Sequence, residues 1–504
     1  MQQWFTLFNS PFSLSFVLIM SSLFFLSRFL RVWVAGRSIK VPPSPPKLPL
    51  IGHLHHLGAL PHHSLRALSQ KYGPLMLLHM GYTPTLVVSS AKMGRELMKT
   101  HDIVFSNRPI TTAAKEFLYS GKDLVFAPHG EYWRQMRRVC VVDLLSVKRV
   151  QSFEFVREEE ICNMVNKINQ ACVTNSDVNL SNLIAIITNN IISRVALGRS
   201  LEGKSEGAKL AKEVAEQFGV FSVGDMFPSL GWIDELTGLK KRMRKTSTAM
   251  HLFLDEVIEE HLMSKKEGVA VDRKDFVDLL LESEKDPTLG VEFTRENLRS
   301  VIMDMLVGGT DTTYTTLEWA MAELANHPTA MKKVQEEVRQ VIGKTTQVNE
   351  NDINKLDYFN CVIKETLRLH PALVLSLPRE SISSTNIEGY HIPDKTRAIV
   401  NLWAIGRDPE IWDKPDEFIP ERFINNPIDF RGKDFEFIPF GGGRRGCPGL
   451  TFGVVSVEAI LANLLYWFDW ELNGSAKELD MTEAFGLSVH LQQALHLVPK
   501  AHLF

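Results

Sequence analysis

Near its C-terminus the sequence reads FGGGRRGCPG, from Phe440 to Gly449, and this loop decides which fold to expect. It holds five glycines, two adjacent arginines and one cysteine. Glycines allow a backbone to fold tightly around Cys447 with N–H groups directed at the sulfur, and such hydrogen bonds tune a thiolate ligand. One cysteine without a second ligand nearby in the sequence argues against most zinc and iron–sulfur sites. It suits a macrocycle that already supplies four nitrogens, and Arg445 can hold a carboxylate of the same cofactor.

The same loop also matches the dinucleotide-binding pattern G-x-G-x-x-G through Gly441, Gly443 and Gly446. That site needs a strand before the glycines and a complete βαβ unit after them. Only about 58 residues follow Gly446, and Pro439 interrupts the approach. The context therefore argues against a dinucleotide site.

The overall charge and the cysteine content exclude other classes. Lys plus Arg (56) nearly balances Asp plus Glu (59), so no nucleic-acid partner is expected. The five cysteines are odd in number and unclustered, which argues against a disulfide framework and a structural zinc site. A reducing compartment is the expected environment.

The N-terminus predicts a membrane anchor. From Trp4 to Ser27 the chain is uncharged and mostly apolar, a length that can cross a bilayer as a helix, and basic residues follow from Arg28. The absence of Lys and Arg from residues 1–11 argues against a cleaved signal peptide. We predict a single-pass anchor over 1–40, a Pro-rich hinge over 41–54 and one catalytic domain over 55–504. The basic flank places that domain in the cytosol.

Within residues 55–504 helical periodicity dominates, so the expected fold class is mainly α with a minor β-sheet region. One helix is expected to start after Thr294 as N-cap and to run to about Asn326, ahead of Pro328. The other long helical stretches are 207–219, 240–265 and 329–342, and the strand-like runs are 74–80, 84–89 and 395–402.

The stretch MLVGGTDTTYTT lies inside that helix. Glycine weakens a helix interior by roughly 1 kcal/mol relative to alanine, so Gly308 and Gly309 need a reason. Two missing side chains let a ligand approach the backbone, whereas a kink where helices cross is the alternative. The carboxyl group of Asp311 beside the hydroxyl of Thr312 can pass protons.

Three further motifs are weak when taken singly. Trp133 and Arg137 lie four residues apart, so both can reach one anion from one helical face. Glu365 and Arg368 in KETLRLHP lie three apart, a spacing that is common in solvated ion pairs. The turn element PERF (420–423) contributes Arg422.

Together these motifs resemble the cytochrome P450 heme-thiolate monooxygenases. FGGGRRGCPG matches F-x-x-G-x-R-x-C-x-G, GGTDTT matches the oxygen-activation helix, and KETLR and PERF match two further elements, all in the family's order. The anchor and PPSPPKLPLIG extend the likeness to the whole chain. The sequence is most similar to microsomal plant members devoted to specialised metabolism, anchored in the endoplasmic reticulum membrane.

The resemblance implies a role for each matching residue. Cys447 corresponds to the axial iron ligand of heme b, and Phe440 to the ring that shields its sulfur. Asp311 and Thr312 correspond to the acid–alcohol pair that delivers protons. The implied heme-propionate partners are Trp133, Arg137, Arg379 and Arg445. The implied structural ion network is Glu365, Arg368 and Arg422.

The resemblance also implies a substrate pocket. Four segments should converge on it: Ile110–Phe126, the helix face with Asp304, Met305, Gly308 and Gly309, the turn Ala372–Leu377, and Phe485–Val489. Within them we expect contacts from Leu373, Val374, Leu377 and Phe485. This mostly apolar composition favours a small hydrophobic plant metabolite, terpenoid-like before phenylpropanoid or coumarin.

The expected reaction uses dioxygen and two electrons from an NADPH–cytochrome reductase. Exposed basic residues would face that partner, and the candidates are Arg134, Arg138, Lys148, Arg149 and Arg444. Two alternatives remain: a heme-thiolate enzyme that rearranges or dehydrates its substrate without dioxygen, and a non-catalytic heme sensor. The Asp311–Thr312 pair argues against both, because neither needs a proton relay.

Overall fold

The computed structural model describes residues 19–20, 22–23, 40–201, 206–266, 273–285, 290–345, 347–473 and 478–503. The anchor predicted over 1–40 therefore lies almost wholly outside the described residues. Lys40 is described: its carbonyl accepts from His391 N at 2.7 Å, and its Nζ lies 4.7 Å from the Tyr390 ring centroid. Pro43 O accepts from Leu77 N. The Pro-rich segment is thus held to the body from Lys40 onward.

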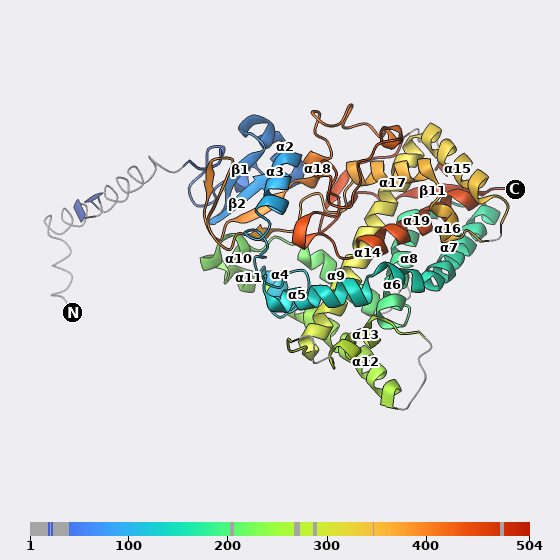
Figure 1. Cartoon of the computed structure of the whole chain (residues 1–504), viewed down its shortest axis with the longest axis horizontal. Coiled ribbons are helices and arrows are strands. Elements are labelled where there is room, and N and C mark those ends of the chain that lie inside the picture. Colours follow the sequence, from blue (N-terminus) through green and yellow to red (C-terminus); the bar gives the residue numbers. More distant parts are fainter. Residues whose placement is uncertain are drawn as a thin grey trace.

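Helices dominate the described chain and strands are a minor part, which confirms the expected fold class (Figure 1). The helices are α2 (Pro61–Tyr72), α3 (Ala91–Arg95), α4 (Thr112–Phe117), α5 (Glu131–Arg138), α6 (Val147–Ser152), α7 (Glu154–Thr174), α8 (Leu180–Leu197), α9 (Glu206–Phe218), α10 (Val223–Met226), α11 (Ile233–Leu236), α12 (Leu239–Lys266), α13 (Phe276–Ser283), α14 (Arg295–Asn326), α15 (Pro328–Ile342), α16 (Glu350–Ile353), α17 (Asp357–Leu369), α18 (Leu402–Ile405) and α19 (Leu450–Trp467). The strands are β1 (Leu75–Met80), β2 (Thr83–Val88), β3 (Val178–Asn179), β4 (Arg379–Glu380), β5 (Thr385–Ile387), β6 (Tyr390–Ile392), β7 (Arg397–Val400), β8 (Phe468–Leu472), β9 (Glu483–Phe485), β10 (Val489–Leu491) and β11 (His496–Ala501).

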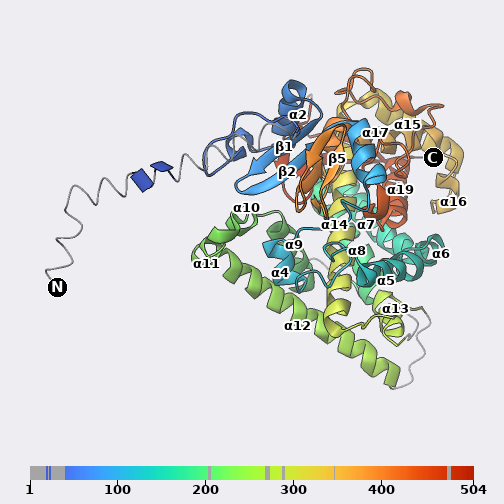
Figure 2. The same cartoon turned by 60° about the vertical axis from the view of Figure 1, so that its left-hand side comes forward.

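The largest sheet has four strands in the order β1-β2-β7-β4. β1 and β2 form an antiparallel hairpin in which Leu75 pairs with Val88 and Met80 with Thr83, and Gly81 makes the turn with φ 64°. β7 pairs in parallel with β2, and β4 pairs antiparallel with β7. With α2 this sheet occupies one end of the molecule, opposite α15 and α16 (Figures 1 and 2). The smaller sheets are β3-β11-β8 and the hairpins β9–β10 and β5–β6.

Helix α14 runs through the middle of the molecule and begins where the sequence predicts (Figure 2). The Thr294 side chain accepts from Asn297 N, and Asn297 Oδ1 accepts from Thr294 N at 2.7 Å. This reciprocal cap satisfies N–H groups that the first helical turn leaves free. The helix ends at Asn326, ahead of Pro328. The predicted boundaries are confirmed.

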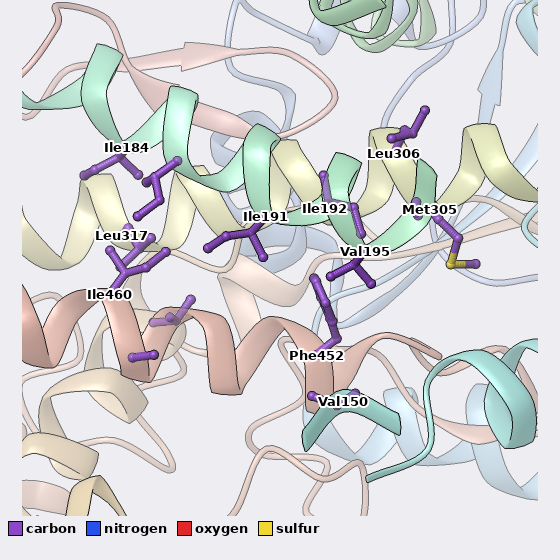
Figure 3. Close-up of a cluster of buried hydrophobic side chains, with 14 of the residues drawn as sticks. Val150, Ile184, Ile191, Ile192, Val195, Met305, Leu306, Leu317, Phe452 and Ile460 are labelled. Carbon is purple, nitrogen blue, oxygen red and sulfur yellow. The ribbon is translucent and has the colours of Figure 1, made fainter. Parts of the chain in front are cut away.

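The core forms where α8, α14 and α19 pack together, as Figure 3 shows for Ile191 and Val195 of α8, Leu317 of α14, and Phe452 and Ile460 of α19. Among the described residues, α8 and α19 are the helices long and apolar enough to cross a membrane, yet most of each is buried inside the body. Burial of apolar surface stabilises the fold by roughly 25 cal/mol per Å². The apolar composition of these two helices is therefore accounted for by core packing.

Candidate active site

A cavity of about 270 Å³ lies between the central helix α14, helix α17 and the glycine-rich loop Phe440–Gly449. It collects side chains from segments that are more than 300 residues apart in the sequence. The predicted site residues that line it are Cys447, Phe440, Trp133, Arg137, Arg379, Arg445, Asp304, Met305, Gly308, Gly309, Thr312, Leu373 and Leu377.

The glycine-rich loop closes on itself before Cys447. Cys447 N donates to Phe440 O at 2.9 Å, and Gly446 N donates to Gly443 O at 3.0 Å. Gly443 has φ 65°, and a Cβ there would lie 2.1 Å from Met98 O. A larger residue at this position would therefore displace the neighbouring backbone.

The thiol of Cys447 opens onto the cavity while the rest of the loop surrounds it. Burial raises the pKa of Cys447, and two groups act in the opposite sense: a hydrogen bond from the Gly449 backbone and the charge of Arg137. Both favour the thiolate form. Of the five cysteines, Cys447 is the one among the cavity-lining residues.

Four arginines, Arg108, Arg137, Arg379 and Arg445, line the same cavity. Burial and then the charge of Arg379 lower the pKa of Arg445 to about 9, and burial lowers that of Arg379. Asp102 pairs with Arg379 at 3.0 Å, which compensates part of this charge. The cavity therefore carries surplus positive charge, as a site for a ligand with two carboxylates requires.

Trp133 supports this arginine cluster without donating into the cavity. Its Nε1 donates to Leu124 O at 3.1 Å. The Arg445 guanidinium lies 4.2 Å from the Trp133 ring centroid, and that of Arg137 lies 5.8 Å away. Arg137 Nη2 donates to Gly446 O at 2.9 Å. The indole thus orients two arginines by stacking, instead of reaching an anion as its spacing from Arg137 suggested.

The two glycines of α14 differ in their surroundings. A Cβ on Gly308 would meet nothing within 4 Å, whereas one on Gly309 would lie 2.8 Å from Cγ1 of Ile192 in α8. Gly308 therefore leaves open space beside the helix, and Gly309 permits the close approach of α8. Gly309 therefore lies at a close helix contact, and the approach of a ligand to Gly308 stays a prediction.

Asp311 and Thr312 are adjacent in α14 but have different surroundings. Thr312 lines the cavity, and its Oγ1 donates to Gly308 O at 2.7 Å. Asp311 does not line it: Ser488 Oγ donates to Asp311 Oδ2 at 2.6 Å, and His490 Nε2 lies 3.5 Å from Oδ1. The β9–β10 hairpin therefore holds the carboxylate on which the predicted proton relay depends.

Val374 and Phe485–Val489, which the sequence leads us to expect in the pocket, lie outside the cavity lining of this structure. Val374 is buried against Trp403 and Val489, because the chain turns after Leu373 and directs this side chain away from the cavity. Phe485 is 43% exposed on the outer strand of its hairpin, where it stacks on His62. None of Phe485–Val489 belongs to the cavity lining, and of Ile110–Phe126 only Leu124 and Val125 do.

Glu365, Arg368 and Arg422 come together away from the cavity. Arg368 donates through Nε and Nη2 to the two Glu365 oxygens at 2.7 Å each, and Arg422 Nε donates to Glu365 Oε1 at 2.9 Å. The Glu365 and Arg368 side chains are 0% exposed, so they do not form a solvated pair. Arg368 also donates to the backbone oxygens of Gly406, Pro415 and Glu417. These hydrogen bonds join α17 to the segment that precedes the PERF turn.

Sequence reasoning missed several residues of this site. Arg108 lines the cavity and donates to Leu377 O at 2.6 Å, but it stands alone in its segment without a recognisable motif. Ile192 belongs to a helix that reads only as core. Ser488 lies in the expected segment Phe485–Val489, but its contact with Asp311, like that of His490, was not predicted and joins residues about 180 positions apart. Only the folded chain brings these groups together.

The described residues thus form a mainly helical body around a cavity lined by one free thiol and four arginines, a donor set that suits a cofactor held by one sulfur ligand and by its carboxylates. The family model of cytochrome P450 matches residues 42–498. The chain belongs to the cytochrome P450 family, and it is an oxidoreductase of the monooxygenase class that carries heme b with a cysteine axial ligand.

Individual relatives agree with this assignment. The chain is 53% identical to cytochrome P450 71A1 of Persea americana, covering 90% of this chain and 92% of that protein. It is 50% identical to phenylacetaldehyde oxime monooxygenase of Prunus mume (95% and 92%) and 45% identical to desmethylyatein synthase of Sinopodophyllum hexandrum (96% and 97%). A zebrafish cytochrome P450 structure with progesterone has the same fold, with a TM-score of 0.76 at 24% identity, covering 88% of this chain and 99% of that one.

Proposed function

We propose that this chain is a monooxygenase that oxidises a small, largely apolar plant specialised metabolite, with Cys447 as the axial ligand of heme b. The observation that carries the proposal is that the Cys447 thiol and the Thr312 hydroxyl line one cavity together with four arginines. The donor set fits the cofactor. Cys447 would supply the thiolate ligand, and the four arginines outnumber the carboxylates that act on them, Asp102 and Asp123, which suits two propionates.

Arg137, Arg379 and Arg445, aided by Arg108, would hold the propionates, while Trp133 keeps the guanidinium planes in place by stacking. Gly449 N–H and Arg137 would stabilise the Cys447 thiolate, and Phe440 would shield it. Heme with a thiolate ligand supplies the activation of dioxygen and the transfer of oxygen to carbon.

In this proposal Asp311 and Thr312 divide the handling of protons. Thr312 lines the cavity and would pass a proton to the reaction site there. Asp311 does not line the cavity and would supply that proton to Thr312. Ser488 and His490 act as positioning residues, because both contact the Asp311 carboxylate and so fix its direction. Transfer to Thr312 then requires a bridging water or a rotation of Asp311 away from Ser488.

The lining predicts the chemistry of the substrate. Met305, Leu373, Leu377 and Ile192 give an apolar wall, so contacts with the substrate are mostly non-directional. Polar handles are few, and they are Asp304, Ser376, Thr312, Thr313 and Thr316. We therefore favour a terpenoid-like molecule with one or two polar groups, with a phenylpropanoid or a coumarin as alternatives.

The electron donor in this proposal is an NADPH–cytochrome reductase in the endoplasmic reticulum membrane, to which residues 1–40 would anchor the chain. The exposed side chains of Arg138, Lys148 and Arg444 give a basic surface near α5, α6 and the Cys447 loop. Arg134 is paired with Glu131 and Arg444 lies 3.7 Å from Asp102, so both contribute less than Arg138 and Lys148.

Turnover assays distinguish this function from the alternatives. The heme-loaded chain, reconstituted with reductase, would be screened against apolar plant metabolites with and without NADPH and dioxygen. We expect an oxygenated product only when both are present. A product that forms without either one would identify a rearranging or dehydrating enzyme, and a chain with a normal heme spectrum that binds but converts none of the panel would favour the sensor alternative.

A further inference from the structure

Two imidazoles and one carboxylate meet outside the cavity, where α2 begins beside strand β9. His62 Nε2 and His63 Nε2 each lie 2.8 Å from the same oxygen, Oε2 of Glu483. The ligand atoms of the three side chains lie within 4.8 Å of one another. The cluster joins segments about 420 residues apart, and neither the heme site nor the buried ion network uses it.

Aromatic contacts hold both rings in place. The Trp403 ring centroid lies 4.1 Å from that of His63 and, edge-on, 5.1 Å from that of His62. The Phe485 ring is stacked with that of His62 at 6.1 Å. Pro61 starts the helix and fixes the backbone before the two histidines. The two Nε2 atoms therefore already lie close together, so a bound ion would not have to immobilise flexible side chains.

A metal ion would replace hydrogen bonds that the cluster already makes. The Nε2 atoms of His62 and His63 each donate to Oε2 of Glu483, so an ion would take the place of the protons between them. Neutral imidazole and ionised carboxylate are the forms that bind divalent metals, and binding releases those protons.

Two nearby arginines are paired outside the cluster, although the charge of Arg407 also acts on Glu483. Arg66 and Arg407 lie over the Trp403 ring at 5.3 and 4.1 Å, and both pair with Asp416, at 3.2 and 3.3 Å. One side of the cluster is open, because the His63 side chain is 46% exposed while those of His62 and Glu483 are buried or nearly so. A hydrated ion can enter from this side and keep water as a further ligand.

We propose that His62, His63 and Glu483 form a binding site for a divalent transition-metal ion of the zinc type, with water completing the coordination. Two imidazole nitrogens and a carboxylate oxygen are a donor set that zinc accepts, whereas magnesium and calcium prefer oxygen alone. No residue of the proposed heme or proton-relay machinery is a ligand, so this site is independent of the proposed function.

A metal here would tie α2 to the β9–β10 hairpin. That hairpin contacts the central helix through Trp319 Nε1, which donates to Val489 O at 2.8 Å, and through Ser488 and Asp311. Binding should therefore slow amide hydrogen exchange across residues 483–491 and raise the melting temperature. Both effects can be measured without turnover.

The test uses the full heme-loaded chain with any affinity tag removed, dialysed first against a chelator and then against zinc chloride. Heme iron serves as the internal standard, and the zinc-to-iron ratio is measured by elemental analysis. We expect His63→Arg to weaken zinc binding at least about tenfold, since even loss of an outer-shell partner costs a metal site 10- to 100-fold. Arginine at this exposed position can still pair with Glu483, so the variant should fold. Glu483→Gln is the second variant.

Matched controls remove other histidines. The first control, His55→Asn with His56→Asn, changes a neighbouring pair of histidines whose rings lie 3.9 Å apart. The second, His261→Gln, removes the imidazole from a separate cluster formed by His261, Asp275 and Asp278. These controls should leave binding unchanged, and X-ray absorption should show nitrogen and oxygen around zinc without sulfur. Equal zinc binding by the parent and His63→Arg, or loss of binding in a control instead, would overturn the proposal.

Discussion

At the scale of single residues, the proposal gives the hydroxyl groups of Thr312 and its neighbour Thr313 different roles: that of Thr312 takes part in proton transfer, and that of Thr313 does not. Both line the cavity. Thr312 Oγ1 bonds to Gly308 O, whereas Thr313 Oγ1 has no partner among the described residues. Only Thr312 directly follows the carboxyl group of Asp311. We therefore assign proton delivery to Thr312 alone.

Thr312→Ala should therefore keep the heme spectrum and substrate binding but divert NADPH electrons to hydrogen peroxide. Product per NADPH should fall by on the order of 10²-fold, the lower range for losing an acid–base group. Thr313→Ala is the control and should remain coupled. Peroxide and product are measured against NADPH consumed, and equal coupling in the two variants would remove Thr312 from the relay.

Leu373 and Val374 form a second matched pair, because only Leu373 lines the cavity. Leu373→Phe should change which carbon is oxidised, since an apolar pocket discriminates by about 1–3 kcal/mol per group. Val374→Phe should keep the product ratio but lower the free energy of unfolding by about 1–3 kcal/mol, because Val374 is packed against Trp403 and Val489. Product analysis and thermal unfolding test both, and the reverse pattern would place Val374 in the pocket.

At the scale of elements, helix α14 owes its close contact with α8 to Gly309 and its free space to Gly308. Gly308→Ala should fold with stability equal to the parent or up to about 1 kcal/mol higher, from helix propensity, while weakening substrate affinity. Gly309→Ala should destabilise, because the new methyl group meets Ile192. Ile192→Ala should therefore cost less stability in the Gly309→Ala protein than in the parent, which a cycle of parent, two single variants and the double variant measures. Unfolding free energies of the four proteins test this, and an equally stable Gly309→Ala would contradict the packing assignment.

A pH-dependent ion pair joins His261 of α12 to the N-cap of α13. His261 Nε2 lies 2.7 Å from Oδ2 of Asp275, the N-cap of α13. Burial lowers the pKa of His261, but the hydrogen bond and charge of Asp275 outweigh it and raise the pKa from 6.5 to about 9. The folded state thus binds the proton on the His261 imidazole more tightly than the unfolded state does.

The stabilisation from His261 should therefore be complete below about pH 6.5 and be lost as the pH rises through about 9. His261→Gln should lower the melting temperature most below pH 6.5 and least above pH 9. Melting curves of both proteins across this range make the comparison. A difference that grows with pH would show that the pair is not charged in the folded state.

Local signals explain which elements the sequence predicts. The ends of α14 follow from Thr294 and Pro328, whose effects act within a few residues, and Cys447 follows from its own loop. Arg108 and the contacts of Ser488 and His490 with Asp311 escaped prediction because they join segments far apart in the chain. Val374 lies outside the cavity lining, and composition could not show this because the direction of a side chain in a turn depends on backbone dihedrals.

At the scale of the whole molecule, the fold isolates one cysteine for chemistry. Cys140 and Cys361 are buried, Cys162 is exposed and Cys172 is partly buried, and none of the four lines the cavity. Burial raises the pKa of Cys140 and of Cys361, so both thiols are protonated at neutral pH. Cys447 precedes α19 and lines the cavity with the arginine cluster and α14, so it is the cysteine positioned to bind a cofactor there.

The most direct test is the absorption spectrum of the reduced, carbon-monoxide-bound protein. The parent and the controls Cys162→Ser and Cys172→Ser should show the Soret band typical of thiolate ligation. Cys447→Ser should lose that band, either with heme retained in another ligation state or with heme lost. A thiolate-type Soret band that persists in Cys447→Ser would contradict the assignment of Cys447 as the iron ligand.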